Sequence, residues 1–131
     1  MSGLNTFDIA GRAMAAQLVR LNTIASNLAN AGSVAGSAAG AYRALKPVFA
    51  TESDGRNATV NVASVERTGT PERRHDPGHP LADASGDIWA AAVDPNQELV
   101  EMIETSRQYA NNVEVLNTAK ALALDTLRLG R

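Results

Sequence analysis

Both ends of the chain carry residues at alternating spacings of three and four that form an apolar stripe, as in a helix packed against another helix. In the N-terminal segment the stripe consists of Phe7, Ala10, Met14, Gln17, Leu21, Ile24, Leu28 and Ala31. In the C-terminal segment it consists of Leu99, Met102, Ser106, Tyr109, Val113, Leu116, Lys120, Ala123 and Leu127. The sequence therefore predicts a mainly α protein in which two long terminal helices pack as a coiled-coil-like hairpin.

Local signals predict where each helix begins and ends. The first helix is expected to begin at Asn5 or Thr6, with Asp8 in its first turn, and to end at Asn30 before a glycine-containing turn. The second helix begins with an aspartate that caps it, a proline at the first helical position and a glutamine three residues after the cap. It should run to about Leu129, where Gly130 ends it.

The second helix is expected to be the longer one by several turns, and its apolar face is wider than a single stripe. Ile103, Ala110 and Leu124 lie beside the main stripe and widen it to a face that needs more than one packing partner. Because helices in water gain most of their stability from tertiary packing, we expect the isolated chain to be partly folded, with both terminal helices fraying.

The middle of the chain is expected to be a small insert, residues 32–93, between the two parts of a discontinuous helical assembly domain, residues 1–31 and 94–131. A flexible Gly/Ser loop is followed by partial alternation at residues 42–50 and 58–66, with turn-forming residues between them, which predicts a β-hairpin. Pro47 marks the first strand as an edge. A lone hairpin is marginal in water, so it should rest on a helix or on a neighbouring subunit. Residues 68–93 are rich in Pro and Gly and are expected to be extended and irregular.

Composition removes several classes of function. The chain has no cysteine and a formal net charge of -2, so thiol chemistry is excluded and no long-range attraction draws it to nucleic acid. The short basic cluster Arg73-Arg74-His75 has an acidic residue on each side and is interpreted as a solvated loop. No cleavable signal peptide is recognisable, and no apolar stretch approaches the roughly 20 residues of a membrane span. We therefore expect neither nucleic-acid binding nor membrane insertion.

The charged residues that could suggest catalysis lack the arrangement that catalysis needs. His75 and His79 have the spacing of a helical zinc pair, but the prolines and glycine around them prevent a helix. Glu98, Glu101 and Glu104 lie on successive helical turns, where an ion-pair face is the simpler interpretation. The sequence predicts no catalytic residue, no cofactor and no metal ligand, and hence no enzyme.

Three ordered motifs resemble those of bacterial flagellar axial proteins, in particular the basal-body rod proteins. They are Ala-Ser-Asn-Leu-Ala-Asn-Ala at residues 25–31, Asp-Pro-Gly-His-Pro-Leu-Ala-Asp-Ala at residues 76–84, and Arg-Gln-Tyr-Ala-Asn-Asn-Val-Glu-Val-Leu-Asn-Thr-Ala-Lys at residues 107–120. Tyr42-Arg43 after the Gly/Ser loop also fits. Within that family the chain is similar to subunits of the proximal rod.

The resemblance implies a structural subunit of a tube-like rod that crosses the periplasm, transmits torque and encloses an export channel. It also implies delivery by the flagellar type III export apparatus without a cleaved signal, and contacts with other copies and other rod subunits. A soluble helical adaptor or export chaperone that binds one client is the alternative. It would form a small defined complex rather than a polymer.

Asparagines inside the C-terminal helix support the assembly hypothesis, because a mid-helix Asn costs several tenths of a kcal/mol relative to Ala. The residues expected at subunit interfaces are the main apolar positions of the two stripes and the asparagines of the terminal motifs. They are Phe7, Met14, Leu21, Ile24, Asn27, Leu28, Asn30, Leu99, Met102, Ile103, Tyr109, Asn112, Val113, Leu116, Asn117, Leu124 and Leu127.

Overall fold

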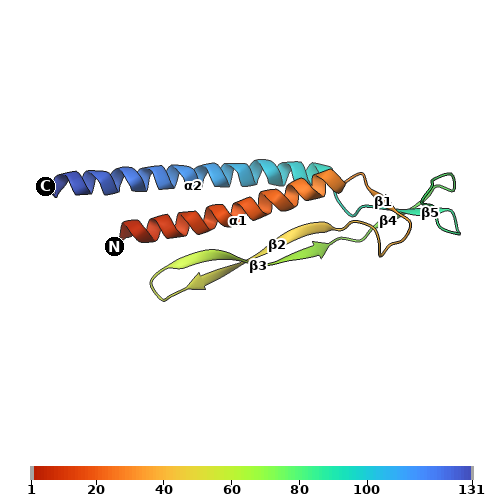
Figure 1. The fold of residues 1–131 in the computed structure, drawn as a ribbon, viewed down its shortest axis with the longest axis horizontal. Coiled ribbons are helices and arrows are strands. Elements are labelled where there is room, and N and C mark those ends of the chain that lie inside the picture. The colour runs from red at the N-terminus through yellow and green to blue at the C-terminus, as the bar shows by residue number, and fades with distance from the viewer. Residues whose placement is uncertain (1, 131) are drawn as a thin grey trace.

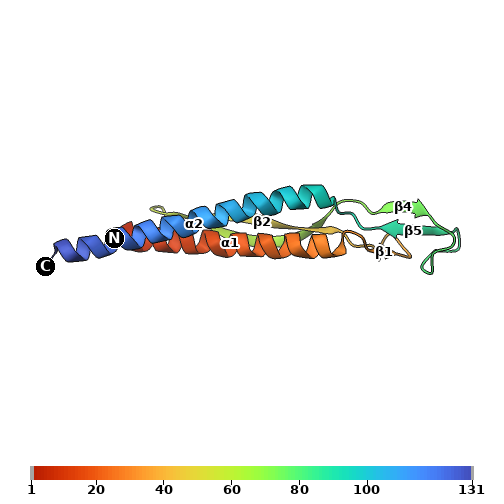
Figure 2. The ribbon, with the colours of Figure 1, turned by 90° about the horizontal axis from the view of Figure 1, so that it is seen from above.

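The protein is an elongated molecule with two helices and a long β-hairpin side by side and a small sheet at one end (Figures 1 and 2). This computed structural model describes residues 2–130, with side chains from residue 5 onward. The elements in chain order are α1 (Ser2–Asn30), β1 (Val34–Ala35), β2 (Ala44–Ser53), β3 (Ala58–Thr68), β4 (Glu72–His75), β5 (Asp87–Ala90) and α2 (Pro95–Leu129). The two chain ends lie together, opposite the small sheet.

The expectation of a mainly α fold with a minor insert is wrong. In the part of the chain that the structure describes there is 48% helix but also 26% strand, in five strands and two antiparallel sheets. Part of the strand content was missed because β4 consists of four exposed residues and shows no alternation of polar and apolar positions. Its structure comes from pairing with β5, which lies more than ten residues away in sequence and which no local pattern can reveal.

The helix α1 begins earlier than expected and ends where expected. Because it begins at Ser2, Asp8 lies beyond the first turn and pairs instead with Arg12, with 3.3 Å between the carboxylate and Nε. At the other end Asn30 donates a side-chain hydrogen bond to the carbonyl of Ser26 and accepts one from Ser33. The bond from Ser33 satisfies a carbonyl that the helix end leaves free.

The helix α2 confirms its predicted boundaries. Asp94 accepts hydrogen bonds from the backbone N–H groups of Asn96 and Gln97, and the N–H of Gly130 donates to the carbonyl of Thr126. Its 35 residues span about 52 Å, against about 43 Å for the 29 residues of α1. The difference is six residues rather than several turns, but α2 still extends past the start of α1 (Figure 1).

The predicted β-hairpin is confirmed as β2 paired with β3, and it is longer than the alternation indicated. The ladder runs from Ala44 opposite Thr68 to Ser53 opposite Ala58, with a bulge between Val48 and Phe49. At the turn the carboxylate of Asp54 accepts backbone hydrogen bonds from Asn57 and Arg56, and these bonds lower the pKa of Asp54. The hairpin lies along α1, so it rests on a helix as expected.

The small sheet at the far end corrects the expectation of irregular chain between residues 68 and 93. Its strand order is β1, β5, β4, with Ile88 buried and Arg73 opposite Trp89. A bridge between Arg43 and Ala92 joins this sheet to the base of the hairpin. Gly69 fits at this joint with a φ of +85°, because a Cβ there would lie 3.1 Å from the Cβ of Ala92.

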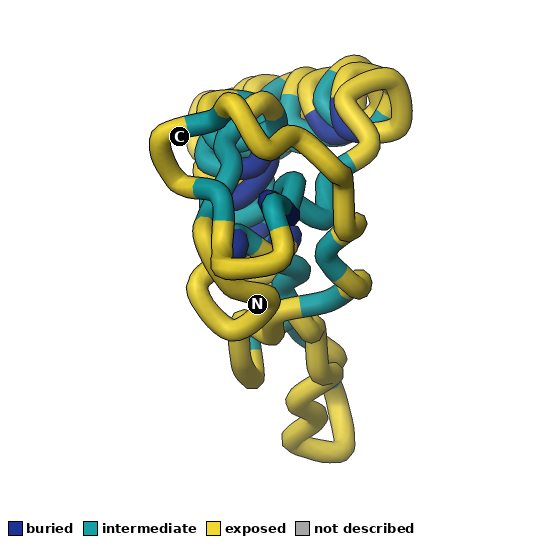
Figure 3. Tube along the Cα trace, turned by 90° about the vertical axis from the view of Figure 1, so that its right-hand side faces the viewer, coloured by how far each residue is buried: buried dark blue, intermediate teal, exposed yellow. Residues whose placement is uncertain are grey.

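The core is narrow and poor in large apolar side chains. Its buried apolar residues are Ala10, Ala16, Ile24, Ala41, Ala44 and Ile88, and its buried polar residues are Thr23, Asn27, Asp87, Glu98 and Thr105. A view along the molecule shows this buried zone enclosed by exposed chain (Figure 3). A core of this kind buries little apolar area and depends on hydrogen bonds to satisfy its polar groups.

Candidate assembly surface

The stripe predicted on α1 packs inside the chain. All eight of its positions, from Phe7 to Ala31, are buried or half-buried, and α1 packs against both α2 and the hairpin. The predicted interface residues Met14, Leu21 and Leu28 are therefore at least partly used within the monomer. Their role between subunits stays a prediction.

The stripe on α2 is rotated from the predicted one at its N-terminal end. Met102, Tyr109, Val113 and Leu116 are half-buried as expected. Near the start of the helix, however, Glu98 and Thr105 are buried. Leu99 and Ser106, one position later, are exposed. Near the start of α2 the structure therefore buries Glu98 and Thr105 and leaves Leu99 exposed, which hydrophobic periodicity does not predict.

Large apolar side chains are exposed along α2 on several sides of the helix, and they are the main candidates for contact with other subunits. The large apolar residues exposed on this helix are Leu99, Val100, Ile103, Val115, Leu122, Leu124, Leu127 and Leu129. Four of them were predicted at the interface, whereas Val100, Val115, Leu122 and Leu129 were not. We call these eight residues the outer α2 face. Exposed apolar surface of this extent marks an interaction site more often than an idle surface.

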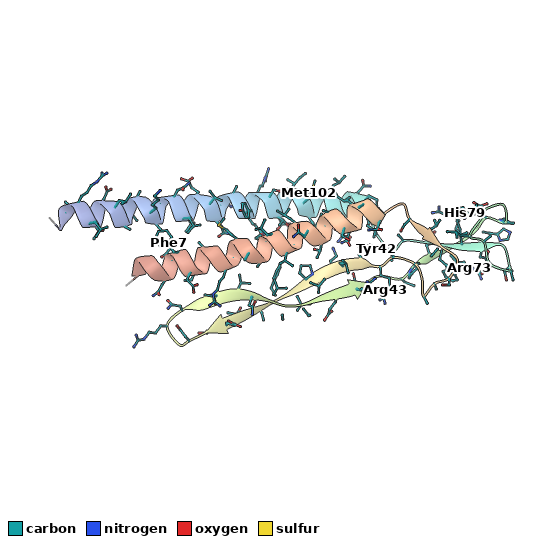
Figure 4. All side chains as sticks on the ribbon, in the orientation of Figure 1. Phe7, Tyr42, Arg43, Arg73, His79 and Met102 are labelled. Atoms are coloured by element: carbon teal, nitrogen blue, oxygen red, sulfur yellow. The ribbon has the colours of Figure 1, made fainter. Side chains whose placement is uncertain are left out.

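A shallow apolar depression lies within this region near the start of α2. It is lined by Met102, Ile103, Ser106, Arg107 and Ala110 and has a volume of about 410 Å³. Figure 4 shows Met102 in the half of α2 nearer the small sheet. The depression offers a place for one apolar side chain from outside the chain.

The amide of Asn27 has a role within the chain that the sequence did not predict. Its side chain is 0% exposed, accepts hydrogen bonds from the N–H of Leu45 and the hydroxyl of Tyr42, and donates one to the carbonyl of Leu45. Tyr42 also contacts Ser26 at 3.0 Å. Asn27 thus occupies both backbone groups of a residue in β2, as a neighbouring strand would. The last turn of α1 therefore fixes the base of the hairpin.

The asparagines of α2 differ from Asn27. Asn112 is half-buried and Asn111 and Asn117 are exposed, and within the described part of the chain their side chains have no hydrogen-bond partner. Because a mid-helix Asn is unfavourable, these amides remain candidates for contacts with another subunit.

A charged cluster joins the hairpin to the start of α2. The Lys46 ammonium lies 3.1 Å from a carboxylate oxygen of Glu98 and 3.0 Å from one of Glu101. Burial lowers the pKa of Lys46, but hydrogen bonds to Glu101 and Glu98, together with their charges, raise it above its ordinary value of 10.5. The second carboxylate oxygen of Glu98 is buried without a hydrogen-bond partner. The cluster therefore holds the hairpin and α2 together while leaving one polar atom unsatisfied.

The residues considered for catalysis are dispersed or engaged. His75 lies 2.8 Å from Asp87 at the small sheet, whereas His79 accepts a hydrogen bond from the N–H of Leu81. Glu104 accepts a hydrogen bond from Gln108 and is not part of the cluster that Glu98 and Glu101 form with Lys46. Among the described residues no group of three or more His, Asp or Glu side chains is placed to hold a metal ion. No helix within residues 2–130 is long and apolar enough to cross a membrane.

The combination of an elongated shape, a small core and a long uncovered apolar helix face defines a class of structural proteins that work by assembling with other subunits. The comparisons with known proteins identify the family. Residues 7–36 match the family described as flagella basal body rod protein. Residues 84–129 match the family described as flagellar basal body rod FlgEFG protein C-terminal.

Full-length relatives agree with these matches. The chain is 49% identical over 134 residues to the flagellar basal-body rod protein FlgC of Salmonella typhimurium, with 100% of both chains covered. It is 39% identical to that of Buchnera aphidicola, with 98% of both covered, and 34% identical to that of Aquifex aeolicus, with 93% of this chain and 92% of the other covered. The chain therefore belongs to the flagellar basal-body rod protein family and is a structural subunit of the rod. The alternative of an adaptor or export chaperone is not favoured.

Proposed function

We propose that this subunit polymerises through its terminal helices with other copies and other rod subunits, forming the part of the rod that crosses the periplasm, transmits torque and encloses the export channel. The observation that carries the proposal is the outer α2 face. Leu127 and Leu129 are 69% and 88% exposed at the end of a helix that extends past α1. Burying each such side chain stabilises a protein by about 1.5–3 kcal/mol. The monomer does not gain this free energy, because the two leucines stay exposed.

The outer α2 face also indicates which segments of the chain have which role. The helical segments 1–31 and 94–131 form the assembly domain, and residues 32–93 tune contacts between subunits. The strands within residues 32–93 are rich in charged and polar side chains, and they have no apolar face as long as the outer α2 face.

Delivery by the type III export apparatus without a cleaved signal completes the proposal. An Ala-rich core without disulfides supports it, because such a core is unfolded at low cost before passage through a narrow channel.

Two variants of the outer α2 face test the assembly role. Leu122→Asp or Leu127→Asp adds a charge where the rod would bury a leucine, at a cost of several kcal/mol to assembly, while the monomer keeps its stability because both positions are exposed. We expect export without rod formation, measured by secretion assays and electron microscopy of basal bodies. Thr118→Asp, also exposed on α2, is the matched control and should leave motility intact. Normal motility of both leucine variants would contradict the proposal.

A further inference from the structure

The β2–β3 hairpin is attached to the helices in two different ways along its length. Its base, residues 44–48 and 64–68, is held by buried polar contacts. Asn27 takes both backbone groups of Leu45, and Lys46 contacts Glu98 and Glu101 on α2. Because Asn27 is fully buried and Glu98 is nearly so, separating the base from the helices would leave polar groups unpaired in the interior.

The outer part of the hairpin, residues 49–62, is held to α1 at the surface. An ion pair joins Arg12 Nη1 to Glu52 Oε2 at 3.2 Å, with side chains that are 48% and 55% exposed. An ion pair in that environment is weak and is screened by salt. Glu52 also accepts a hydrogen bond from Asn61 within the hairpin. Breaking the ion pair therefore costs little, because the Glu52 carboxylate keeps this hydrogen bond.

The apolar contact beneath the outer part borders an open groove. Ala15, Ala16 and Val19 of α1 line this groove of about 300 Å³ together with Val60 and Val62 of β3. A second, polar groove of about 500 Å³ separates the hairpin turn from the first turns of α1. Both grooves open to the surface, so the outer part of the hairpin covers α1 only partly.

The boundary between the two parts coincides with the bulge opposite Val48 and Phe49, where Ala63 of β3 is the extra residue. A β-bulge interrupts the ladder and bends the strand that contains it. The hairpin is therefore divided into a fixed base and an outer part by a built-in point of bending.

We propose that residues 49–62 form a strap that opens away from α1 about this bulge and uncovers the small apolar side chains of Ala16 and Val19, next to the exposed Ala15, for a helix of a second copy. The leucines of the outer α2 face, which have little cover in the monomer, are of a size to fill the space that opens above these small side chains. The choice of a second copy as occupant rests on the proposed function. The opening itself does not.

Hydrogen exchange on the purified full chain tests the opening. In Arg12→Ala, amides of residues 49–62 should exchange about two- to fivefold faster than in wild type, as expected for loss of a surface ion pair, and added salt should have the same effect on wild type. Amides of the base should not change. Arg56→Ala, which removes an exposed arginine at the turn, is the matched control. Equal acceleration of base and outer part, or no acceleration, would overturn the proposal.

A disulfide staple tests whether assembly needs the opening. The chain has no cysteine, so Ala16→Cys with Val62→Cys introduces a single pair across the groove. We expect each single variant to be motile and the oxidised double variant to lack rods, with rods regained under reducing growth. Motility of the verified disulfide form, or a defect that reduction does not relieve, would overturn the assembly role of the strap. The exchange result is independent of the rod, so it separates failure of the strap from failure of the proposed function.

Discussion

The two ends of α2 reverse the usual placement of polar and apolar side chains. In its first turns Glu98 is 2% exposed and is held by Lys46 from the hairpin, whereas at its other end Leu127 and Leu129 are mostly exposed. A charged group is thus buried where the fold closes on itself, and leucines are uncovered where the helix extends past α1. The first end is completed within the chain, and the second end needs another molecule.

The difference teaches that apolar periodicity alone does not say whether a stripe serves the monomer or the assembly. The stripes of α1 and α2 have the same spacing, but α1 lies between α2 and the hairpin and its stripe is used internally. The distinction depends on which helix has neighbours on two sides. Substitutions at the closed end should therefore change the free energy of unfolding, and substitutions at the open end should change assembly.

The largest effect on stability is expected from Asn27→Ala. The substitution leaves the N–H and the carbonyl of Leu45 buried without their partner, at a cost of about 1–3 kcal/mol for each unsatisfied group. We expect the free energy of unfolding to fall by about 3–4 kcal/mol in denaturant titrations. Asn22→Ala, at an exposed position of the same helix, is the control and should change it by less than about 0.5 kcal/mol. Similar losses for both would show that the hairpin base is not fixed by Asn27.

Lys46→Met should have the next largest effect because it leaves the carboxylate of Glu98 buried without its charged partner. We expect a loss of about 2–3 kcal/mol, the lower end of the range for a buried pair, since the lysine is partly exposed. The raised pKa of Lys46 means that its contribution is complete below the unfolded pKa and is lost as the pH rises through the folded one. Wild type should therefore lose stability above about pH 10.5, its ordinary pKa, and should approach the variant. A constant difference between them through that range would contradict the role of the ammonium.

A smaller effect tests the joint between the hairpin and the small sheet. Gly69→Ala places a Cβ 3.1 Å from that of Ala92, whereas Gly55→Ala at the hairpin turn has the same φ of +85° and open space around it. Both substitutions cost about 1 kcal/mol for the left-handed backbone, so the extra loss in Gly69→Ala, about 1 kcal/mol from overpacking, reports the joint. Equal losses would indicate that the joint adjusts freely.

Much of the fold was predictable where the signal is local. The cap formed by Asp94, the end of α1 at Asn30 and the turn between β2 and β3 each depend on neighbouring residues, and all three are confirmed. The sheet of β1, β4 and β5 was missed because its strands pair across long loops. No pattern in the residues around Arg73 or Trp89 indicates that these two residues lie opposite each other.

The candidate surface was only partly predictable for a related physical reason. Hydrophobic periodicity placed Ile103 and Leu124 beside the main stripe, and both are exposed, but it assigned Leu99 and Leu127 to the stripe itself, whereas the structure leaves both exposed and puts Glu98 into the seam. A buried glutamate is unfavourable unless a cation from elsewhere in the fold neutralises it. Lys46 supplies that cation from a strand 52 residues away. The rotation of the stripe therefore depends on a tertiary contact that the sequence pattern does not contain.

Thiol labelling of the outer α2 face tests the central claim most directly. A single cysteine at Leu127 in this cysteine-free chain should react rapidly with a maleimide in the isolated subunit, because the position is exposed. In isolated basal bodies it should be protected by at least tenfold, whereas a cysteine at Arg73 in the small sheet, equally exposed in the subunit, should remain more reactive. Equal and rapid labelling of position 127 in the subunit and in the assembled rod would contradict the account.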